Sequence, residues 1–241
     1  MRTLVISDIH ANATAFEAVL KEAGEFDRTW CLGDIVGYGP DPERCIEMLQ
    51  SLPELTCVMG NHDAALLRLI DVTAFNDDAR IALEIQAEHI SQASRDYLER
   101  MQVVIEKNGI TFVHGSPRDP IWEYIINLAI ARANFGYFQS QICLIGHSHI
   151  PSLFVEKEKG DVFLLQPSHG DMWRSEQRFI LNPGSVGQPR DNNPRASYVI
   201  YNDEAEIWQF QRVAYDIDSV QSRIIDMGLP MRHAARLYHG M

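Results

Sequence analysis

The first sixty residues alternate short apolar runs with stretches of helical periodicity. Buried strands are predicted at Thr3–Ser7, Thr29–Leu32 and Leu55–Met59, and helices at Ala13–Lys21 and Pro42–Ser51. Because each helix lies between two strands and carries the chain back across the sheet, the strands are expected to run parallel. This part of the chain therefore predicts βαβ units, with helices packed on a parallel sheet.

The middle of the chain is mainly helical before it returns to strands. A helical region from about residue 64 to 100 is expected to break near residues 71–78 and again near 91–94. Val103–Glu106 and Ile110–His114 then flank Asn108-Gly109, a dipeptide that favours a two-residue hairpin turn. Two further elements are predicted, a helix over Ile125–Phe138 and a short buried strand over Ile142–Ile145.

Beyond Pro151 the pattern changes to antiparallel strands joined by Gly, Asn and Asp turns. The predicted strands are Leu153–Glu156, Val162–Gln166, Arg178–Leu181, Ser197–Tyr201 and Glu206–Arg212. Helical periodicity returns at Ile217, and no linker divides the chain. The predicted architecture is one α/β domain over residues 1–241 with two sheets, the first mixed and the second mostly antiparallel, and a helical tail from about residue 216.

The composition is that of an ordinary globular protein, with 46% hydrophobic and 22% charged residues. No apolar run reaches the ~18 residues that a bilayer-spanning helix needs, so no membrane association is expected. The apolar stretch at the N-terminus ends at Asp8, which makes it too short for the core of a signal peptide. A cytoplasmic protein is the simplest interpretation.

Cysteine usage and charge narrow the chemistry further. The cysteines lack the spacing of a thiolate metal site and are expected to be free thiols in this compartment: Cys31, Cys45, Cys57 and Cys143. The formal charge of −12 argues against a broad nucleic-acid-binding face, which would need clustered Lys and Arg. A short phosphorylated substrate stays compatible with this charge, because bound metal ions can supply local positive charge.

Aspartate, histidine and asparagine residues follow the predicted strands at the points where the strands end. They occur in the segments Asp8-Ile9-His10, Gly33-Asp34, Gly60-Asn61-His62-Asp63, His114-Gly115 and Gly146-His147-Ser148-His149. In open α/β sheets, ligands bind outside the carboxyl ends of the strands. The glycines beside most of these segments allow sharp turns and a close approach of the backbone. Five strand ends are therefore predicted to deliver carboxylates, imidazoles and a carboxamide to one edge.

These residue types indicate a metal site. Imidazole with carboxylate and no thiolate suits Mn, Fe, Zn or Ni, and the candidates are too many for one ion. With one carboxylate shared, they would provide two ions with four ligands each, as in two-metal hydrolytic sites whose ions lie about 3.5–4 Å apart. Taken singly, Asp8 and Asp34 could cap helices, Asn61 could adopt a left-handed turn, and each histidine could be an ordinary polar residue. Their joint placement favours metal binding.

Taken in order, these five segments resemble the motifs of the calcineurin-like metallophosphoesterases. The resemblance extends from residue 3 to about residue 200 and includes Asn182-Pro183-Gly184-Ser185, which resembles the late strand and turn of small bacterial and archaeal members. It implies a four-layer αββα sandwich, in which two sheets are flanked by helices. It also implies one metal ion held by Asp8, His10, Asp34 and His149, and a second held by Asp34, Asn61, His114 and His147, with Asp34 bridging.

Two positions depart from the better-known phosphatases of that family, which carry Asp and Arg where this chain has Gly37 and Tyr38. The Asp would pair with the motif histidine, His62, and the Arg would contact phosphate. Tyr38 and Arg190 are the candidate substrate contacts, with Arg190 supplying a replacement cation. Without a carboxylate at position 37, His62 is expected to titrate near its ordinary pKa of about 6.5.

The predicted function is hydrolysis of phosphodiester or phosphomonoester bonds in small molecules by a metal-bound hydroxide. His62 would act as general acid, and Asp63 would orient the backbone of its motif. The alternatives are a metallophosphoesterase fold kept as a protein-interaction scaffold, and a nuclease of the same superfamily. Retention of His62 and of the whole ligand set favours an enzyme. The net charge of −12 argues against long polynucleotides as substrates.

The remaining histidines and two nearby aromatic residues have plainer interpretations. His169 lies in a loop and is not expected to reach the cleft. Trp122 and Tyr124 could form a wall of the substrate site, but ordinary packing is the preferred interpretation. Surface positions in helices are predicted for His89, His233 and His239.

Overall fold

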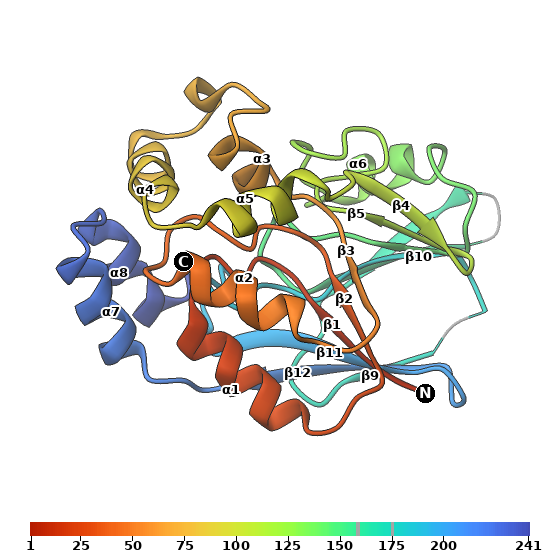
Figure 1. The fold of residues 1–241 in the computed structure, drawn as a ribbon. Helices are drawn as coiled ribbons and strands as arrows, with labels where there is room; N and C mark the ends of the chain where they lie inside the picture. Colours follow the sequence, from red (N-terminus) through yellow and green to blue (C-terminus); the bar gives the residue numbers. More distant parts are fainter. Residues whose placement is uncertain (158–159, 175) are drawn as a thin grey trace.

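Two six-stranded sheets lie face to face in the computed structural model, which describes residues 1–157, 160–174 and 176–241 (Figure 1). The first sheet contains β1 (Arg2–Ile6), β2 (Arg28–Cys31), β3 (Leu55–Cys57), β9 (Met172–Trp173), β11 (Ala196–Asn202) and β12 (Ile207–Val213). The second contains β4 (Val104–Lys107), β5 (Ile110–Val113), β6 (Ile142–Leu144), β7 (Ser152–Glu156), β8 (Val162–Leu165) and β10 (Phe179–Asn182).

Strand order explains how distant parts of the chain meet. The first sheet has the order β3-β2-β1-β11-β12-β9, and the second has the order β4-β5-β6-β10-β7-β8. The first three strands run parallel, as predicted. Among the described strands, each sheet has two parallel and three antiparallel pairs. The second sheet is therefore mostly antiparallel, as predicted, but the first is equally so, because β11 and β12 extend it. The short strand β9 was not predicted.

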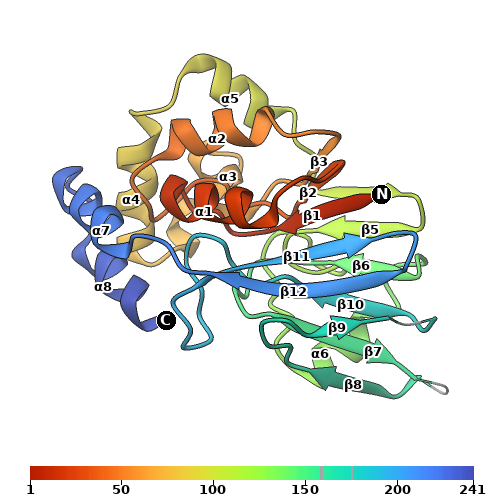
Figure 2. The ribbon, with the colours of Figure 1, turned by 90° about the horizontal axis from the view of Figure 1, so that it is seen from below.

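Helices cover the outer faces of both sheets, which confirms the predicted αββα sandwich (Figure 2). The helices are α1 (Ala13–Ala23), α2 (Pro42–Gln50), α3 (Asn61–Leu66), the 3₁₀ turn η1 (Val72–Ala74), α4 (Asp77–Ala87), α5 (Gln92–Glu99), α6 (Leu128–Asn134), α7 (Ile217–Asp226) and α8 (Met231–His239). The helical middle region breaks where predicted. The predicted helix over Ile125–Phe138 is too long, because Asn127 caps α6 by accepting a hydrogen bond from the Ile130 amide.

Alternation along the strands builds separate apolar layers. In β1, Leu4 and Ile6 face the helices, whereas Val5 faces the second sheet. Between the sheets, the rings of Phe179 in β10 and Trp208 in β12 meet edge to face at 5.7 Å. Each fully buried side chain of this size contributes roughly 1.5–3 kcal/mol, so this layer holds the two sheets together. The four cysteines are free, as predicted.

The C-terminal helices α7 and α8 pack on α4 at the end of the molecule where the β1–β3 strands finish (Figure 1). Their contact is apolar, with Val220, Ile224 and Leu237 beside Ala82. Arg223 also donates hydrogen bonds to the Thr14 hydroxyl at 2.7 Å and to the Asp41 carboxylate at 3.0 Å. Among the helices of the described residues, none is long and apolar enough to cross a bilayer.

Candidate metal centre

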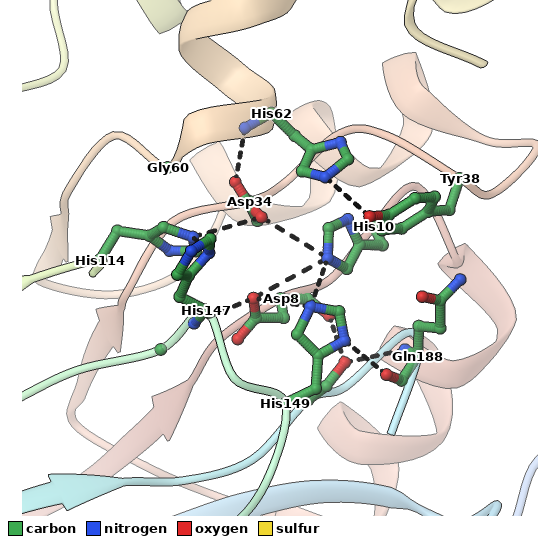
Figure 3. A network of polar contacts seen from close by, with 12 residues as sticks. Asp8, His10, Asp34, Tyr38, Gly60, His62, His114, His147, His149 and Gln188 are labelled. Atoms are coloured by element: carbon green, nitrogen blue, oxygen red, sulfur yellow. Dashed lines mark hydrogen bonds and ion pairs between the residues drawn. The ribbon is translucent and has the colours of Figure 1, made fainter. Parts of the chain in front are cut away.

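The strand-end segments meet at one buried edge of the sandwich, as the sequence predicts (Figure 3). Two sets of ligand atoms form there, and within each set all atoms lie within 4.8 Å of one another. One set is Asp8, His10, Asp34 and His149, and the other is Asp34, His114 and His147. Asn61, the remaining candidate, starts α3, and its Oδ1 lies 3.0 Å from His114 Nε2.

Asp34 lies between the two sets. Its Oδ2 is 3.6 Å from His10 Nε2 and 3.3 Å from His114 Nε2. Its Oδ1 accepts a hydrogen bond of 2.8 Å from the His62 amide, which fixes the orientation of the carboxylate. One carboxylate is therefore placed where it can contact two ions at once.

The backbone of these segments has an uncommon conformation. φ is positive, between 48° and 66°, at five of the candidate ligands: Asp8, His10, Asp34, His147 and His149. Residues other than glycine rarely adopt a positive φ. Each one that does stores roughly 1–3 kcal/mol of strain, so the surrounding structure must hold it in place. Hydrogen bonds between the loops do so: Asp8 N–H donates to Gly33 O at 3.0 Å, and His10 N–H donates to Asp34 O at 2.9 Å.

Asp63 orients the backbone of its motif, as predicted. Its buried carboxylate accepts hydrogen bonds from the backbone amides of Asp34, Ile35, Val36 and Gly60 at 2.8–3.2 Å. The late turn braces the opposite side, where the Ser185 hydroxyl donates to the Asp8 carbonyl at 2.8 Å. Asp63 thus holds the Asp34 segment from one side, and Ser185 holds the Asp8 segment from the other.

The imidazoles of the first set point bare nitrogens at each other. His10 Nδ1 lies 2.9 Å from the Val36 carbonyl, and His149 Nδ1 lies 2.6 Å from the Gln188 carbonyl. Since a carbonyl only accepts, both Nδ1 atoms carry the proton, and both Nε2 atoms of the neutral rings carry lone pairs. These Nε2 atoms are 3.1 Å apart. Two lone pairs at that distance repel each other unless a cation lies beside them, so the set fits a metal ion.

The second set has the same arrangement. His114 Nδ1 donates to the Leu32 carbonyl at 2.7 Å, and His147 Nε2 donates to the Trp122 carbonyl at 3.1 Å. The inward atoms are then His114 Nε2 and His147 Nδ1, which are 3.2 Å apart. Both sets therefore satisfy the donor chemistry of a divalent ion with imidazole and carboxylate ligands.

Protonation also suits metal binding. Burial lowers the pKa of His10, of His147 to about 3, and of His149, which also lies near the Arg190 charge. These rings are therefore neutral, which is the form that binds a metal. His114 differs: burial opposes its charge, but the Asp34 carboxylate raises its pKa to about 10. Binding of an ion there would release this proton.

His62 and Tyr38 form a pair beside the first set. His62 Nε2 is 3.0 Å from the Tyr38 hydroxyl, which accepts a hydrogen bond of 3.3 Å from Arg190. The expected ordinary titration of His62 is wrong, because burial lowers its pKa to about 4 and the Arg190 charge adds to this effect. The place of the missing Asp is filled by His62 itself: a Cβ on Gly37 would lie 2.2 Å from its Nδ1.

A pocket of about 100 Å³ opens onto this centre, and it includes residues that were given ordinary packing roles. Arg190 lines it, together with Phe75, Trp122 and Tyr124. Trp122 and Tyr124 thus line a pocket in addition to their packing contacts, and Tyr124 stacks on His147 with ring centroids 3.8 Å apart. The signal that could have found them is their position directly after the strand that ends at His114.

The prediction that His233 is a surface residue is also wrong. Its side chain in α8 is buried, its ring lies 4.8 Å from that of Tyr38, and its Nε2 is 3.1 Å from the Asp78 carbonyl. The end of α8 also contacts the segment after Arg190, where the Asn192 amide donates to the Gly240 carbonyl at 2.9 Å. The other predicted positions hold: His89 and His239 are exposed, and His169 accepts a hydrogen bond from the Arg212 amide in β12.

Comparisons with known proteins bear on the whole chain. A family model described as a calcineurin-like phosphoesterase superfamily domain matches residues 1–206. The crystal structure of a metallophosphoesterase from Sphaerobacter thermophilus is 43% identical and superposes with a TM-score of 0.91, covering 100% of this chain and 99% of that chain.

Two curated relatives extend the likeness. The uncharacterized protein MJ0912 of Methanocaldococcus jannaschii is 36% identical over 245 residues, which cover 98% of this chain and 97% of that protein. Phosphodiesterase YfcE of Escherichia coli K12 is 24% identical over 214 residues, which cover 84% of this chain and 89% of YfcE. The helices α7 and α8 lie beyond the segment that the family model matches.

Proposed function

The chain belongs to the calcineurin-like phosphoesterase superfamily, and from that premise we propose that it is a dinuclear metal-dependent hydrolase of small phosphate monoesters or diesters. The observation that carries the proposal is the Asp34 carboxylate between two sets of imidazoles whose ring nitrogens face inward. A protein-interaction scaffold would have no need to keep two buried lone pairs opposed at 3.1 Å, as His10 and His149 do. A bound cation would relieve this unfavourable contact.

We assign Asp8, His10, Asp34 and His149 to one ion, and Asp34, Asn61, His114 and His147 to the other. Mn, Fe, Zn and Ni all suit these donors. Bound ions would supply Lewis acidity and lower the pKa of a water molecule toward about 7, so that a nucleophile exists at neutral pH. The chain's own contribution is to hold the donors in place through the carbonyl contacts and strained loops described above.

Arg190 and Tyr38 are the proposed substrate contacts. The Arg190 guanidinium lies over the Tyr38 ring at 5.6 Å and donates to Gln188 Oε1 at 2.9 Å, which holds it at the wall of the pocket. A guanidinium in this position can bind a phosphoryl oxygen through charge-assisted hydrogen bonds. It would thus replace the arginine that the family motif carries at position 38.

His62 is the proposed catalytic residue, with a role set by its protonation. Its lowered pKa makes the ring neutral at pH 7, so it does not hold a stored proton. A neutral imidazole still has one N–H, which can donate to the departing oxygen as negative charge develops there. The Tyr38 hydroxyl contacts Nε2 of this ring at 3.0 Å and fixes its orientation.

The test is a set of turnover measurements with p-nitrophenyl phosphate and bis(p-nitrophenyl) phosphate in the presence of each metal. We expect activity that depends on added metal and falls by at least about 10²-fold in His114→Ala. The matched control is His89→Ala, an exposed histidine that does not line the pocket. Absence of turnover in protein that holds two ions would support the scaffold instead.

A further inference from the structure

The pocket at the metal centre is too small for a whole substrate. Its volume is about 100 Å³, whereas sites that enclose drug-sized ligands measure about 300–1,000 Å³. Its polar wall contains Arg190 and four of the candidate ligands, Asp34, Asn61, His147 and His149. A phosphoryl group can enter, and the group that it carries must lie at the rim.

The rim is aromatic and comes from two separate segments. Phe75 follows η1, and Trp122 and Tyr124 lie in the loop between β5 and α6. The rings of Phe75 and Trp122 meet at 5.1 Å. Tyr124 has one face on His147 at an interplanar angle of 20°, yet 43% of the residue is exposed. Its other face is therefore open, directly beside a proposed metal ligand.

The loop that carries two of these rings is held in place. Glu123, between Trp122 and Tyr124, accepts hydrogen bonds from the Ser116 hydroxyl at 2.6 Å and from the Asn134 amide at 2.8 Å, and pairs with Arg118. The Trp122 carbonyl is fixed by His147, as described above. An aromatic surface that is rigid before binding loses little conformational entropy when a ligand stacks on it.

We propose that this aromatic rim, formed by Phe75, Trp122 and Tyr124, binds a flat aromatic group attached to the phosphate. The preferred substrates are then nucleotide-like esters, in which the phosphoryl group enters the pocket and the base stacks at the rim. The inference rests on the proposed function, because it concerns the same centre. Stacking of a base on an aromatic side chain changes affinity by about 5- to 150-fold.

The test compares substrates that differ only in the base. The methyl ester of thymidine 5′-phosphate competes in one tube with the same ester of the abasic sugar phosphate, and consumption of each is followed by phosphorus NMR. The corresponding pair of monoesters is measured in the same way. Both members of a pair have the same leaving groups, so the ratio of kcat/KM reports recognition of the base alone. We expect a ratio of about 5–150 in favour of the base.

Variants then locate the effect. Phe75→Leu and Trp122→Leu keep apolar bulk but remove a ring, and each is expected to bring the ratio closer to one. Tyr124→Phe keeps the ring and should keep the ratio. Tyr137→Leu, which removes an exposed aromatic ring outside the pocket, is the matched control and should also keep it.

The outcomes are separable. Equal consumption of both members of each pair by the wild-type protein overturns the aromatic subsite and leaves the phosphoesterase proposal standing. A base preference that persists in Phe75→Leu and Trp122→Leu overturns the assignment to this rim. If neither member is consumed by protein that also fails on p-nitrophenyl esters, the proposed function itself fails.

Discussion

Restoring the family's aspartate at Gly37 should damage the protein. Gly37 has φ +90°, and a Cβ there would lie 2.2 Å from Nδ1 and 2.9 Å from Cγ of His62. His62 cannot move away easily, because it is buried, contacts the Tyr38 hydroxyl and has the Phe75 ring 4.9 Å from its own. The His62 ring can therefore occupy its position only because residue 37 has no side chain. A side chain at position 37 would compete with the ring for the same space.

The cost of Gly37→Ala has two parts. A left-handed backbone costs a residue with a Cβ about 1–2 kcal/mol, and forcing an atom into a filled site costs a further ~1–3 kcal/mol. Gly170 provides the matched control, since it has the same φ of +90° and nothing within 4 Å of its Cβ position. Gly170→Ala should thus be destabilised only by the cost of the left-handed backbone. The free energies of unfolding of the two variants should therefore differ by about 1–3 kcal/mol.

Urea unfolding of both variants measures this difference, and metal-dependent turnover is assayed alongside. We expect Gly37→Ala to be the less stable variant, and Gly37→Asp to be at least as unstable and to have lower turnover than the wild type. If the two alanine variants lose equal stability, steric conflict with His62 is not the reason for the glycine. If Gly37→Asp raises turnover, the aspartate is compatible with this site and the reasoning is refuted.

Three further predictions concern single residues. The purified protein should hold about two ions per chain, and Asp34→Asn should weaken both sites. Elemental analysis that finds one ion lost and the other bound at full affinity would disprove the bridge. His62→Ala should keep its metals, lose little activity on p-nitrophenyl esters and lose about 10²–10³-fold on alkyl esters, whose leaving oxygen develops more negative charge for the His62 N–H to stabilise. Equal losses on both substrate types would show that His62 positions phosphate instead. Burial lowers the pKa of His233, so the folded protein binds this proton less readily than the unfolded chain, which binds it below about pH 6.5. The free energy of unfolding should therefore fall more steeply between pH 7 and pH 5 in the wild type than in His233→Phe, and equal slopes would argue against a buried neutral ring.

The arrangement of the candidate ligands was predictable because it follows from local signals. Each ligand stands directly after an apolar run that reads as a strand, and parallel strands end at a common edge. The hairpin was equally clear, since Asn108 and Gly109 adopt the positive φ values, 53° and 75°, that this turn needs. At the strand ends and at this turn, residues adjacent in the sequence determine the local structure.

The misinterpreted residues depend on contacts that no local pattern encodes. His233 lies in an amphipathic helix and reads as a surface residue until α8 docks against Tyr38, almost the whole chain away. Tyr124 is exposed in a loop, and only the position of His147 turns its ring into part of a site. The lowered pKa of His62 likewise comes from burial that its motif does not reveal. The environments of these three residues were mispredicted because they depend on packing between distant segments, and not because the secondary structure was predicted wrongly.

The hydrogen bond between Asn192 and Gly240, together with the contact between the His233 and Tyr38 rings, gives the site an order of assembly during synthesis. Every candidate metal ligand has emerged from the ribosome once His149 is made, and Ser185 and Gln188, which hold Asp8 and His149, follow. The residues in α8 that brace Tyr38 and the Arg190 segment emerge later still. At about 5–20 residues per second, the delay is several seconds or more. A nascent chain can thus acquire its ions before it can hold a substrate. A domain fused after residue 240 would therefore disturb the positions of Tyr38 and Arg190, and it would leave metal binding unchanged.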